Sequence, residues 1–282
     1  MEVLKNKKNL QDFIERQKEM GKRIGFAPTM GALHNGHLSL YEEAKKENDL
    51  VVSSIFVNPT QFNNPEDLEK YPRDINRDIL ILKNSGLVDA VYIPEVQDIY
   101  PEKTVSQHYD FDGLENEMEG KSRPGHFDGV GTVVEELFRQ VKPDNAYFGE
   151  KDFQQLAIIK KMVEKKHLAI KIKGVAIYRA ENGLALSSRN QRLHEDRREA
   201  SKVIYETLKK VNEWFRIITI PEIKERVQDI FDQQKGMQLE YFLIADENTL
   251  KETDFFYKDK SYRAFIVVVV DAVRLIDNMH LD

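Results

Sequence analysis

The sequence of 282 residues contains no cysteine. This absence excludes disulfides, thiolate metal sites, iron–sulfur clusters and a cysteine nucleophile. Long hydrophobic runs are missing as well, because the longest strongly apolar run, residues 265–270, is far too short to span a bilayer. The lysine-rich residues 1–10 also lack the apolar stretch of a signal peptide. We therefore expect a soluble, cytoplasmic protein with no membrane partner.

An excess of basic residues is missing too. The chain has 42 Lys and Arg against 48 Asp and Glu, which gives a net charge of −6. Proteins that bind nucleic acid through its backbone charge normally carry a basic excess. We therefore expect no nucleic-acid partner, and any anion site must be local. The lysine pairs at 160–161 and 165–166 are interpreted as the solvated face of a helix.

Apolar runs alternate with helical patterns over the first two thirds of the chain. Strands are expected at 23–27, 49–57, 88–93, 146–148 and 168–178, and helices at 38–47, 74–85, 130–141 and 153–166. Nearly continuous apolar strands separated by helices are typical of a parallel sheet that is covered on both faces. Right-handed crossovers then predict a doubly wound, Rossmann-like α/β fold.

The pattern changes after residue 189. Residues 190–235 are highly charged and helical, with Pro221 placed as a first-turn proline, and strands are expected at 239–245, 263–270 and 273–276. Helices followed by clustered strands indicate a smaller α+β domain. We predict a domain boundary between about 175 and 190, which gives domains 1–177 and 178–282.

The first candidate site is the segment PTMGALHNGH at 28–37, where a strand meets its helix. Ligands of open α/β sheets bind at the carboxyl ends of strands, and helix N-termini attract anions. Gly31 and Gly36 allow close approach of a phosphate, and His34 and His37 share one helix face, from which they could donate to phosphate oxygens. An ordinary glycine-rich turn is the alternative. A zinc site is weaker, because helical zinc pairs are usually four residues apart.

Further along the chain, several segments narrow the interpretation. His34–His37 resembles the HxGH motif of the nucleotidylyltransferase superfamily, which includes class I aminoacyl-tRNA synthetases. It is followed, in order, by FVNPTQF (56–62), YPR (71–73), RPGHF (123–127), FGEKDFQQL (148–156), GLALSSRN (183–190) and RLIDN (274–278). Together these segments resemble the pantothenate synthetase (pantoate–β-alanine ligase) family over nearly the whole chain.

The resemblance implies a two-step ligation. Pantoate attacks the α-phosphate of ATP to give pantoyl adenylate and pyrophosphate, and the amine of β-alanine then attacks the acyl carbon to release pantothenate and AMP. No covalent enzyme intermediate is needed, which agrees with the missing cysteine. The resemblance also implies a homodimer, and a smaller C-terminal domain that closes over the site.

The resemblance implies an ATP-binding set that includes both histidines and the segments around Lys151 and Arg189. This set is Met30, Gly31, Ala32, Leu33, His34, Asn35, Gly36, His37, Gly149, Glu150, Lys151, Asp152, Tyr178 (through its backbone), Leu186, Ser187, Ser188 and Arg189, with His34, His37, Lys151 and Arg189 catalytic. Lys151 adds a cation where a helix N-terminus already favours an anion, which a purely structural role would avoid. Two hydroxyls and a guanidinium at 187–189 suit a phosphate, although a Ser-Ser-Arg tripeptide alone is ordinary loop composition.

The resemblance assigns pantoate to Gln61 and Gln155, and β-alanine to Gln61. Taken alone, Gln61 is typical of a surface loop, and the spacing of Asp152 and Gln155 also fits a capping box. Asn58 is a softer candidate beside Gln61. Arg123 and His126 are expected to make secondary contacts.

Mg²⁺ is expected with ATP, because the triphosphate must be neutralised and Mg²⁺ binds phosphates with one or two carboxylates. Asp78 is the candidate protein ligand by the resemblance, although its neighbour Arg77 replaces an acid found in some relatives. Another HxGH nucleotidylyltransferase is the nearest alternative function. A tRNA ligase is disfavoured by the short, acidic chain. A nucleotide-binding regulator is disfavoured because the histidine pair occurs together with Lys151 and Arg189.

Overall fold

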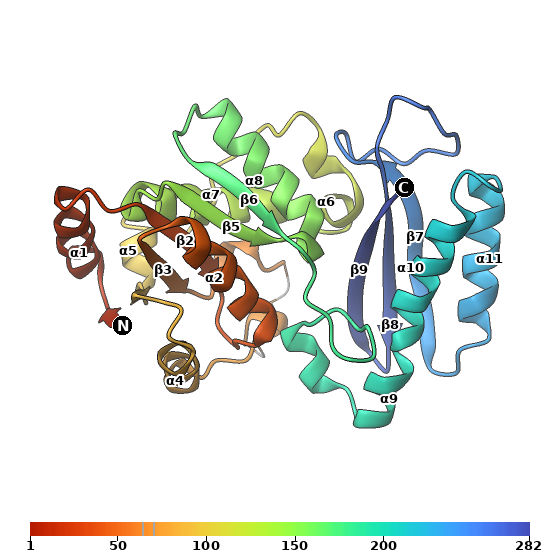
Figure 1. Ribbon diagram of the computed structural model, residues 1–282, viewed down its shortest axis with the longest axis horizontal. Coiled ribbons are helices and arrows are strands. Elements are labelled where there is room, and N and C mark those ends of the chain that lie inside the picture. The colour runs from red at the N-terminus through yellow and green to blue at the C-terminus, as the bar shows by residue number, and fades with distance from the viewer. Residues whose placement is uncertain (64, 70) are drawn as a thin grey trace. The chain divides into compact units, whose positions relative to one another are not determined.

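The computed structural model describes residues 1–63, 65–69 and 71–282. The chain forms two compact units, of which the first comprises Met1–Glu150 with Gln154–Ala176 and the second Lys151–Phe153 with Ile177–Asp282 (Figure 1). None of the helices in these residues has the length and apolar character needed to cross a membrane.

The first unit is built on a six-stranded sheet in the order β1-β4-β3-β2-β5-β6, in which all neighbouring strands run parallel. The strands are β1 (Glu2–Leu4), β2 (Ile24–Thr29), β3 (Leu50–Ile55), β4 (Ala90–Tyr92), β5 (Asn145–Gly149) and β6 (Lys171–Val175). Every residue of β3 is buried, including Ser53 and Ser54, as its largely apolar sequence predicts for an interior parallel strand. The predicted doubly wound α/β fold is confirmed.

Helices flank this sheet (Figure 1). They are α1 (Lys7–Glu19), α2 (Asn35–Glu47), α3 (Pro65–Glu69), α4 (Ile75–Ser85), α5 (Val96–Ile99), α6 (Met118–Ser122), α7 (His126–Val141) and α8 (Phe153–Lys165). Local signals set their ends. Asp74 caps α4 by accepting the N–H of Arg77, and Gly86 ends that helix in the left-handed conformation.

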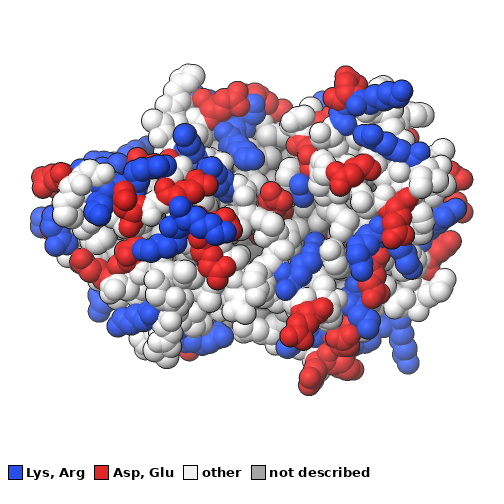
Figure 2. All heavy atoms as spheres, viewed as in Figure 1, with Lys and Arg blue, Asp and Glu red and all other residues white. Residues whose placement is uncertain are grey.

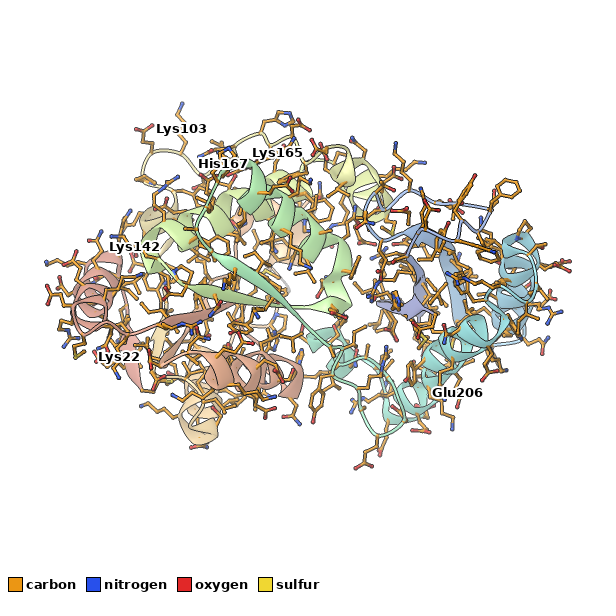
Figure 3. All side chains as sticks on the ribbon, turned by 45° about the horizontal axis from the view of Figure 1, so that its top comes forward. Lys22, Lys103, Lys142, Lys165, His167 and Glu206 are labelled. Carbon is orange, nitrogen blue, oxygen red and sulfur yellow. The ribbon has the colours of Figure 1, made fainter. Side chains whose placement is uncertain are left out.

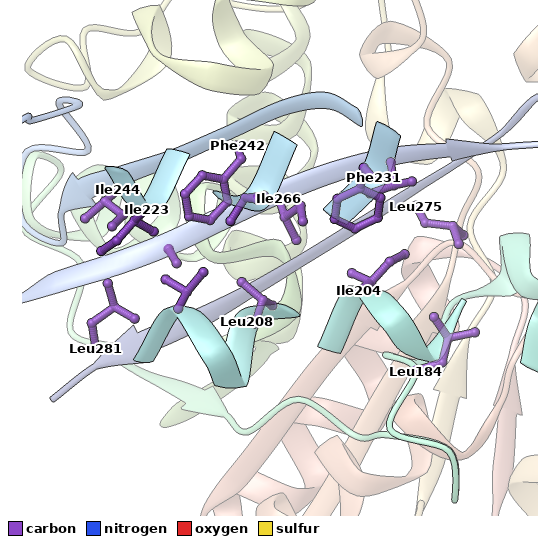
Figure 4. Close-up of a cluster of buried hydrophobic side chains, with 14 of the residues drawn as sticks. Leu184, Ile204, Leu208, Ile223, Phe231, Phe242, Ile244, Ile266, Leu275 and Leu281 are labelled. Atoms are coloured by element: carbon purple, nitrogen blue, oxygen red, sulfur yellow. The ribbon is translucent and has the colours of Figure 1, made fainter. Parts of the chain in front are cut away.

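The second unit packs helices against a three-stranded antiparallel sheet, which confirms the predicted α+β character. Its strands are β7 (Met237–Asp246), β8 (Tyr262–Val270) and β9 (Val273–Leu281), and its helices are α9 (Glu195–Ala200), α10 (Lys202–Trp214) and α11 (Ile220–Asp232). In Figure 4 apolar side chains of α10 and α11, such as Leu208 and Ile223, meet those of the strands, such as Ile266. Pro221 lies in the first turn of α11, which Thr219 caps.

Charges of both signs are interspersed on the face drawn in Figure 2. The lysines near the end of α8 have acidic neighbours: Lys165, labelled in Figure 3, lies 2.8 Å from Asp110, and Lys161 lies 3.3 Å from Asp112. These cations are thus paired within the chain. This matches the interpretation of α8 as a solvated, charged helix face.

Candidate active site

The order of the strands creates a topological switch point in the first unit. Strands β2 and β5 are neighbours, with Phe26 opposite Ala146, while the chain continues from β2 to β3 on one side and from β5 to β6 on the other. Such a switch point leaves a crevice outside the carboxyl ends of the strands. Residues 30–37 leave β2 at this edge, and Gly149 and Glu150 lie at the end of β5. The structure thus brings these two predicted ATP-binding segments to adjacent strand ends.

The histidine pair opens α2, whose first residue is Asn35. His34 is the N-cap, and its Nδ1 accepts the N–H of Gly36 at 3.1 Å, while Nδ1 of His37 accepts the N–H of His34 at 3.3 Å. The ring centroids are 4.1 Å apart. An Nδ1 that accepts a hydrogen bond places the proton of a neutral imidazole on Nε2. Both rings can therefore donate Nε2–H to an anion, at a helix end that already favours negative charge.

A buried carboxylate fixes the turn that precedes His34. Asp78 on α4 is 1% exposed, and its Oδ2 and Oδ1 accept the N–H groups of Ala32 at 2.9 Å and Leu33 at 2.8 Å. The turn needs this support, because Gly31 and Ala32 both have positive φ, +86° and +52°. A Cβ on Gly31 would lie 2.8 Å from Asp78 Oδ2, so a larger residue would displace the carboxylate.

The surroundings of Asp78 do not suit a protein-built metal site. Both of its carboxylate oxygens accept backbone hydrogen bonds, and its side chain is buried. Within residues 1–63, 65–69 and 71–282, no three His, Asp or Glu side chains gather where they could hold a metal ion. The described residues therefore fit a metal that arrives with phosphates better than one held in a dedicated cage. A direct role of Asp78 at the metal stays a prediction.

Gln61 is anchored from several sides. It lies in the 3-10 turn Pro59–Gln61 after β3 and is 9% exposed. Its Nε2 donates to Met30 Sδ at 3.0 Å, and its Oε1 accepts from Asn58 Nδ2 at 3.2 Å. The predicted pantoate-binding glutamine and the predicted ATP-binding Met30 are therefore in direct contact.

Arg123 and His126 contact Gln61 through its main chain. Nη2 of Arg123 and Nδ1 of His126 both donate to the carbonyl oxygen of Gln61, at 3.1 Å and 2.8 Å. Since a carbonyl only accepts, His126 carries its proton on Nδ1, and its Nε2 accepts from Arg123 Nη1 at 3.4 Å. The predicted secondary residues thus lie beside the predicted pantoate site.

Asn58, which the sequence indicates only as a weaker candidate than Gln61 for substrate binding, is buried, and both atoms of its amide make hydrogen bonds. Its Oδ1 accepts the hydroxyl of Tyr100 at 2.6 Å, and its Nδ2 also donates to the carbonyl of Gly129 at 3.0 Å. Burial raises the pKa of Tyr100, so its phenol stays a hydrogen-bond donor at neutral pH. Tyr100 lies 42 residues from Asn58, and no local pattern indicates this partnership.

The two glutamines at the start of α8 differ in their surroundings. Gln154 is buried, and its Nε2 donates to the carbonyls of Leu114 and Glu117, both at 2.8 Å. Gln155, the predicted pantoate ligand, is half-buried. Adjacent residues of a helix point in different directions. Gln155 therefore lies on another side of α8 than Gln154, whose amide is bound to the main chain.

The second unit holds the remaining predicted residues. Lys151 and Asp152 lie in the 3-10 turn Glu150–Asp152, with Lys151 Nζ 3.6 Å from Asp152 Oδ1. Tyr178 and Leu186 are brought together, because the N–H of Leu186 donates to the carbonyl of Tyr178 at 2.9 Å. The backbone of the tyrosine, its predicted point of contact, is thereby tied to the loop that continues into 187–189.

That loop ends in a short helical turn. Ser187 caps the 3-10 helix Ser188–Arg192, and its hydroxyl accepts the N–H of Arg189 at 3.2 Å. The two hydroxyls and the guanidinium thus occupy consecutive positions of one ordered turn. This arrangement suits a phosphate, since hydroxyls and a guanidinium are its usual donors.

Comparison with known proteins agrees with this geometry. The model of the pantoate–beta-alanine ligase family matches residues 2–280. Pantothenate synthetase of Christiangramia forsetii is 49% identical over 282 residues, covering 100% of both chains. That of Flavobacterium psychrophilum is 52% identical over 272 residues, covering 96% of this chain and 95% of the relative.

Solved structures give the same result. The pantothenate synthetase of Thermus thermophilus superposes with a TM-score of 0.89 at 37% identity, covering 99% of both chains. The pantoate–beta-alanine ligase of Francisella tularensis, complexed with beta-gamma ATP and beta-alanine, gives a TM-score of 0.81 at 38% identity, covering 99% of this chain and 97% of the other. The chain therefore belongs to the pantoate–beta-alanine ligase family.

Proposed function

We propose that this protein joins pantoate to β-alanine to form pantothenate, driven by ATP, through a pantoyl-adenylate intermediate. Membership of the ligase family over residues 2–280 supports this function. The observation that carries it is that Nδ1 of both His34 and His37 accepts a backbone N–H at the start of α2, because this leaves Nε2 of each neutral ring as the donor. A related ligase that holds beta-gamma ATP and beta-alanine supports the same two substrates.

The proposed chemistry has two displacement steps. A carboxylate oxygen of pantoate attacks the α-phosphorus of ATP, the bond to the bridging oxygen breaks, and pyrophosphate leaves. The neutral amine of β-alanine then attacks the acyl carbon, AMP leaves, and the amine loses a proton as the amide forms. The protein has to align the reactants and stabilise the charge that accumulates on phosphate oxygens.

We assign that stabilisation to two groups of residues. His34 and His37 would donate Nε2–H to phosphate oxygens, and this hydrogen bonding strengthens as the pyrophosphate gains charge. Lys151 and Arg189, with the hydroxyls at 187 and 188, would bind the polyphosphate as the remaining cations and donors. Met30 to Gly36, Gly149 to Asp152, and the backbones of Tyr178 and Leu186 complete the proposed ATP-binding set.

Gln61 and Gln155 are the proposed ligands of pantoate, and Gln61 also that of β-alanine. A neutral amide can hold a hydroxyl or a carboxylate without the desolvation cost of a charged group. The support for Gln61 is its fixed position, because contacts from Met30, Asn58 and Arg123 restrain the residue before any ligand binds.

Three further attributes are proposed from family membership. Mg²⁺ would enter with ATP, held chiefly by the phosphates, where it neutralises their charge. The enzyme would work in the cytoplasm, where ATP is supplied. It would form a homodimer, and sedimentation velocity can test this oligomeric state.

The function is tested by ATP–pyrophosphate exchange with and without pantoate. Exchange that requires pantoate, followed by AMP release only when β-alanine is added, is the expected result, because adenylation precedes amide formation. Exchange that ignores pantoate would contradict the assignment. It would favour a nucleotidylyltransferase that acts on another acceptor.

A second prediction concerns Gly129 on α7. A Cβ at this position would lie 2.6 Å from the carbonyl oxygen of Thr60 and 2.8 Å from the backbone nitrogen of Gln61. Main-chain atoms cannot swing aside, so Gly129→Ala has to displace the turn that carries Gln61. We expect KM for pantoate to rise about tenfold, as a misplaced positioning residue would cause.

The control for this prediction is Val130→Ala, which shortens the buried side chain next to Gly129 and adds no atom that could push against the turn. It should lower the melting temperature and leave KM for pantoate unchanged. Glycine to alanine in a free helix position normally stabilises by about 1 kcal/mol. A stabilised Gly129→Ala protein with unchanged KM would therefore refute the predicted displacement.

A further inference from the structure

Two consecutive polar residues of β9, Asp277 and Asn278, are buried in the second unit. They are 4% and 2% exposed, and they belong to the RLIDN segment, to which the ATP and pantoate contacts above assign no role. Neighbouring residues of a strand point to opposite sides. The two side chains can therefore hold two different segments of the chain at once, and buried polar groups need such partners.

Asn278 holds the main chain at Lys151. Its Nδ2 donates to the carbonyl oxygen of Lys151 at 2.9 Å, and its Oδ1 accepts from Arg263 Nη1 at 2.6 Å. The same guanidinium lies over the ring of Phe153, with Cζ 4.0 Å from the ring centroid. These contacts explain why residues 151–153 group with the second unit rather than with the remainder of α8.

Asp277 holds the segment that leads to Ser187 and Arg189. Its oxygens accept from Arg179 Nη1 at 2.6 Å and Nη2 at 3.0 Å, and Nη1 also donates to the carbonyl of Gly183 at 3.1 Å. Burial raises the pKa of Asp277, and the Arg179 guanidinium opposes that rise. Arg179 is further stacked on Tyr205, with Cζ 3.9 Å from the ring centroid.

We propose that Asp277 and Asn278 are positioning residues for adenylation, which fix Lys151 and the 178–189 segment on one strand. Asn278 acts through a main-chain carbonyl, which restrains the backbone from which the Lys151 side chain extends. Asp277 acts through Arg179, at the base of the hairpin that the bridge between Arg179 and Ala185 closes. One rigid strand thus sets the spacing of two groups that would bind the same polyphosphate. The proposal rests on the proposed ligase function.

The test uses substitutions of unchanged size. Asn278→Asp keeps an acceptor for Arg263 but cannot donate to the Lys151 carbonyl. Its new charge faces that guanidinium, which also pairs with Glu247 at 2.7 Å. Asp277→Asn keeps the shape but removes the charge that binds Arg179. We expect each to lower kcat/KM for ATP in pantoate-dependent exchange by about tenfold to a hundredfold, as for misplaced phosphate-binding groups. KM for pantoate should change little.

A matched control is available in the same unit. Asp271 forms a second bidentate pair with an arginine, accepting from Arg197 Nε at 2.7 Å and Nη2 at 2.9 Å. Neither residue of this pair belongs to segments 151–153 or 178–189. Asp271→Asn should leave exchange unchanged. Val227→Ala, in the core of the unit, should reduce the melting temperature and also leave exchange unchanged.

The outcomes separate the possible roles. If Asn278→Asp and Asp277→Asn only lower the melting temperature, as Val227→Ala does, and exchange is retained, the residues are structural and the proposal is overturned. Because the two residues hold different segments, either variant tests the proposal if the other does not fold. Wild-type protein without pantoate-dependent exchange would instead overturn the ligase function itself. Calorimetric titration with ATP alone then measures whether Asn278→Asp still weakens ATP binding.

Discussion

Replacing His37 with asparagine is expected to slow pantoate-dependent ATP–pyrophosphate exchange by about 10²–10³-fold, the usual loss for one donor to transition-state charge. Stability should change little. The side-chain amide of asparagine can reproduce the Nδ1 acceptor that takes the N–H of His34 and caps α2, but it does not reach the position of Nε2. Steady-state exchange and thermal unfolding, measured on the same preparation, check both halves of this prediction.

A second substitution at position 37 distinguishes the role of Nε2 from that of Nδ1. Glutamine at position 37 extends far enough to place a donor near Nε2, but it loses the acceptor close to the backbone. His37→Gln should therefore keep more of the rate than His37→Asn and cost about 0.5–2 kcal/mol of stability through the weakened cap.

His167→Asn is the control for both variants. His167 is exposed and has φ +51°, a conformation that asparagine tolerates (Figure 3). The substitution should therefore change neither the exchange rate nor the thermal stability. A rate that His37→Asn retains and His37→Gln loses would show that the ring serves the helix cap rather than the reaction.

The parallel sheet was predictable because its signals are local. A largely apolar segment such as 50–55 predicts a buried strand, so strands and helices of the first unit follow from short stretches of sequence. Helix α1, which the sequence analysis does not predict, also carries local signals. Asn6 caps it, and Leu10, Phe13 and Ile14 form the apolar stripe of an amphipathic helix, although the lysines around them hide it.

The contacts that position the candidate site were not predictable in this way. The hydrogen bond from Asn278 to Lys151 joins residues 127 apart, and those from Asp78 to the turn before His34 span 45 and 46 residues. No periodicity or spacing in the sequence predicts these hydrogen bonds, because each forms only when two elements distant in sequence pack together. Sequence motifs identify Lys151 and His34 as candidates, whereas the residues that fix their backbones emerge from the fold.

Asp78→Ala is expected to have the largest effect on stability among these substitutions. The N–H groups of Ala32 and Leu33 are buried, with the two residues 4% and 0% exposed, so loss of the carboxylate leaves both donors without their acceptor. Each unsatisfied donor costs roughly 1–3 kcal/mol. For a protein of this size, the melting temperature should fall by about 2–4 °C for each kcal/mol. Exchange should fall as well, because the turn that loses its support leads directly into His34.

Asp74→Ala is the matched control, since it removes an aspartate from the same helix. Asp74 caps α4 by accepting the N–H of Arg77 at 2.9 Å and lies at the surface, so its loss should cost about 1 kcal/mol and leave exchange unchanged.

Asp78→Asn separates the positioning role of Asp78 from a role at the metal. One oxygen remains to accept a backbone N–H, but the new NH₂ group faces the other backbone donor, so the turn is still disturbed. If Asp78 acts by holding the turn, raising the Mg²⁺ concentration will not restore exchange in this variant. Recovery of the rate at high Mg²⁺ would instead show that the carboxylate contributes to the metal, because mass action then compensates for a lost ligand.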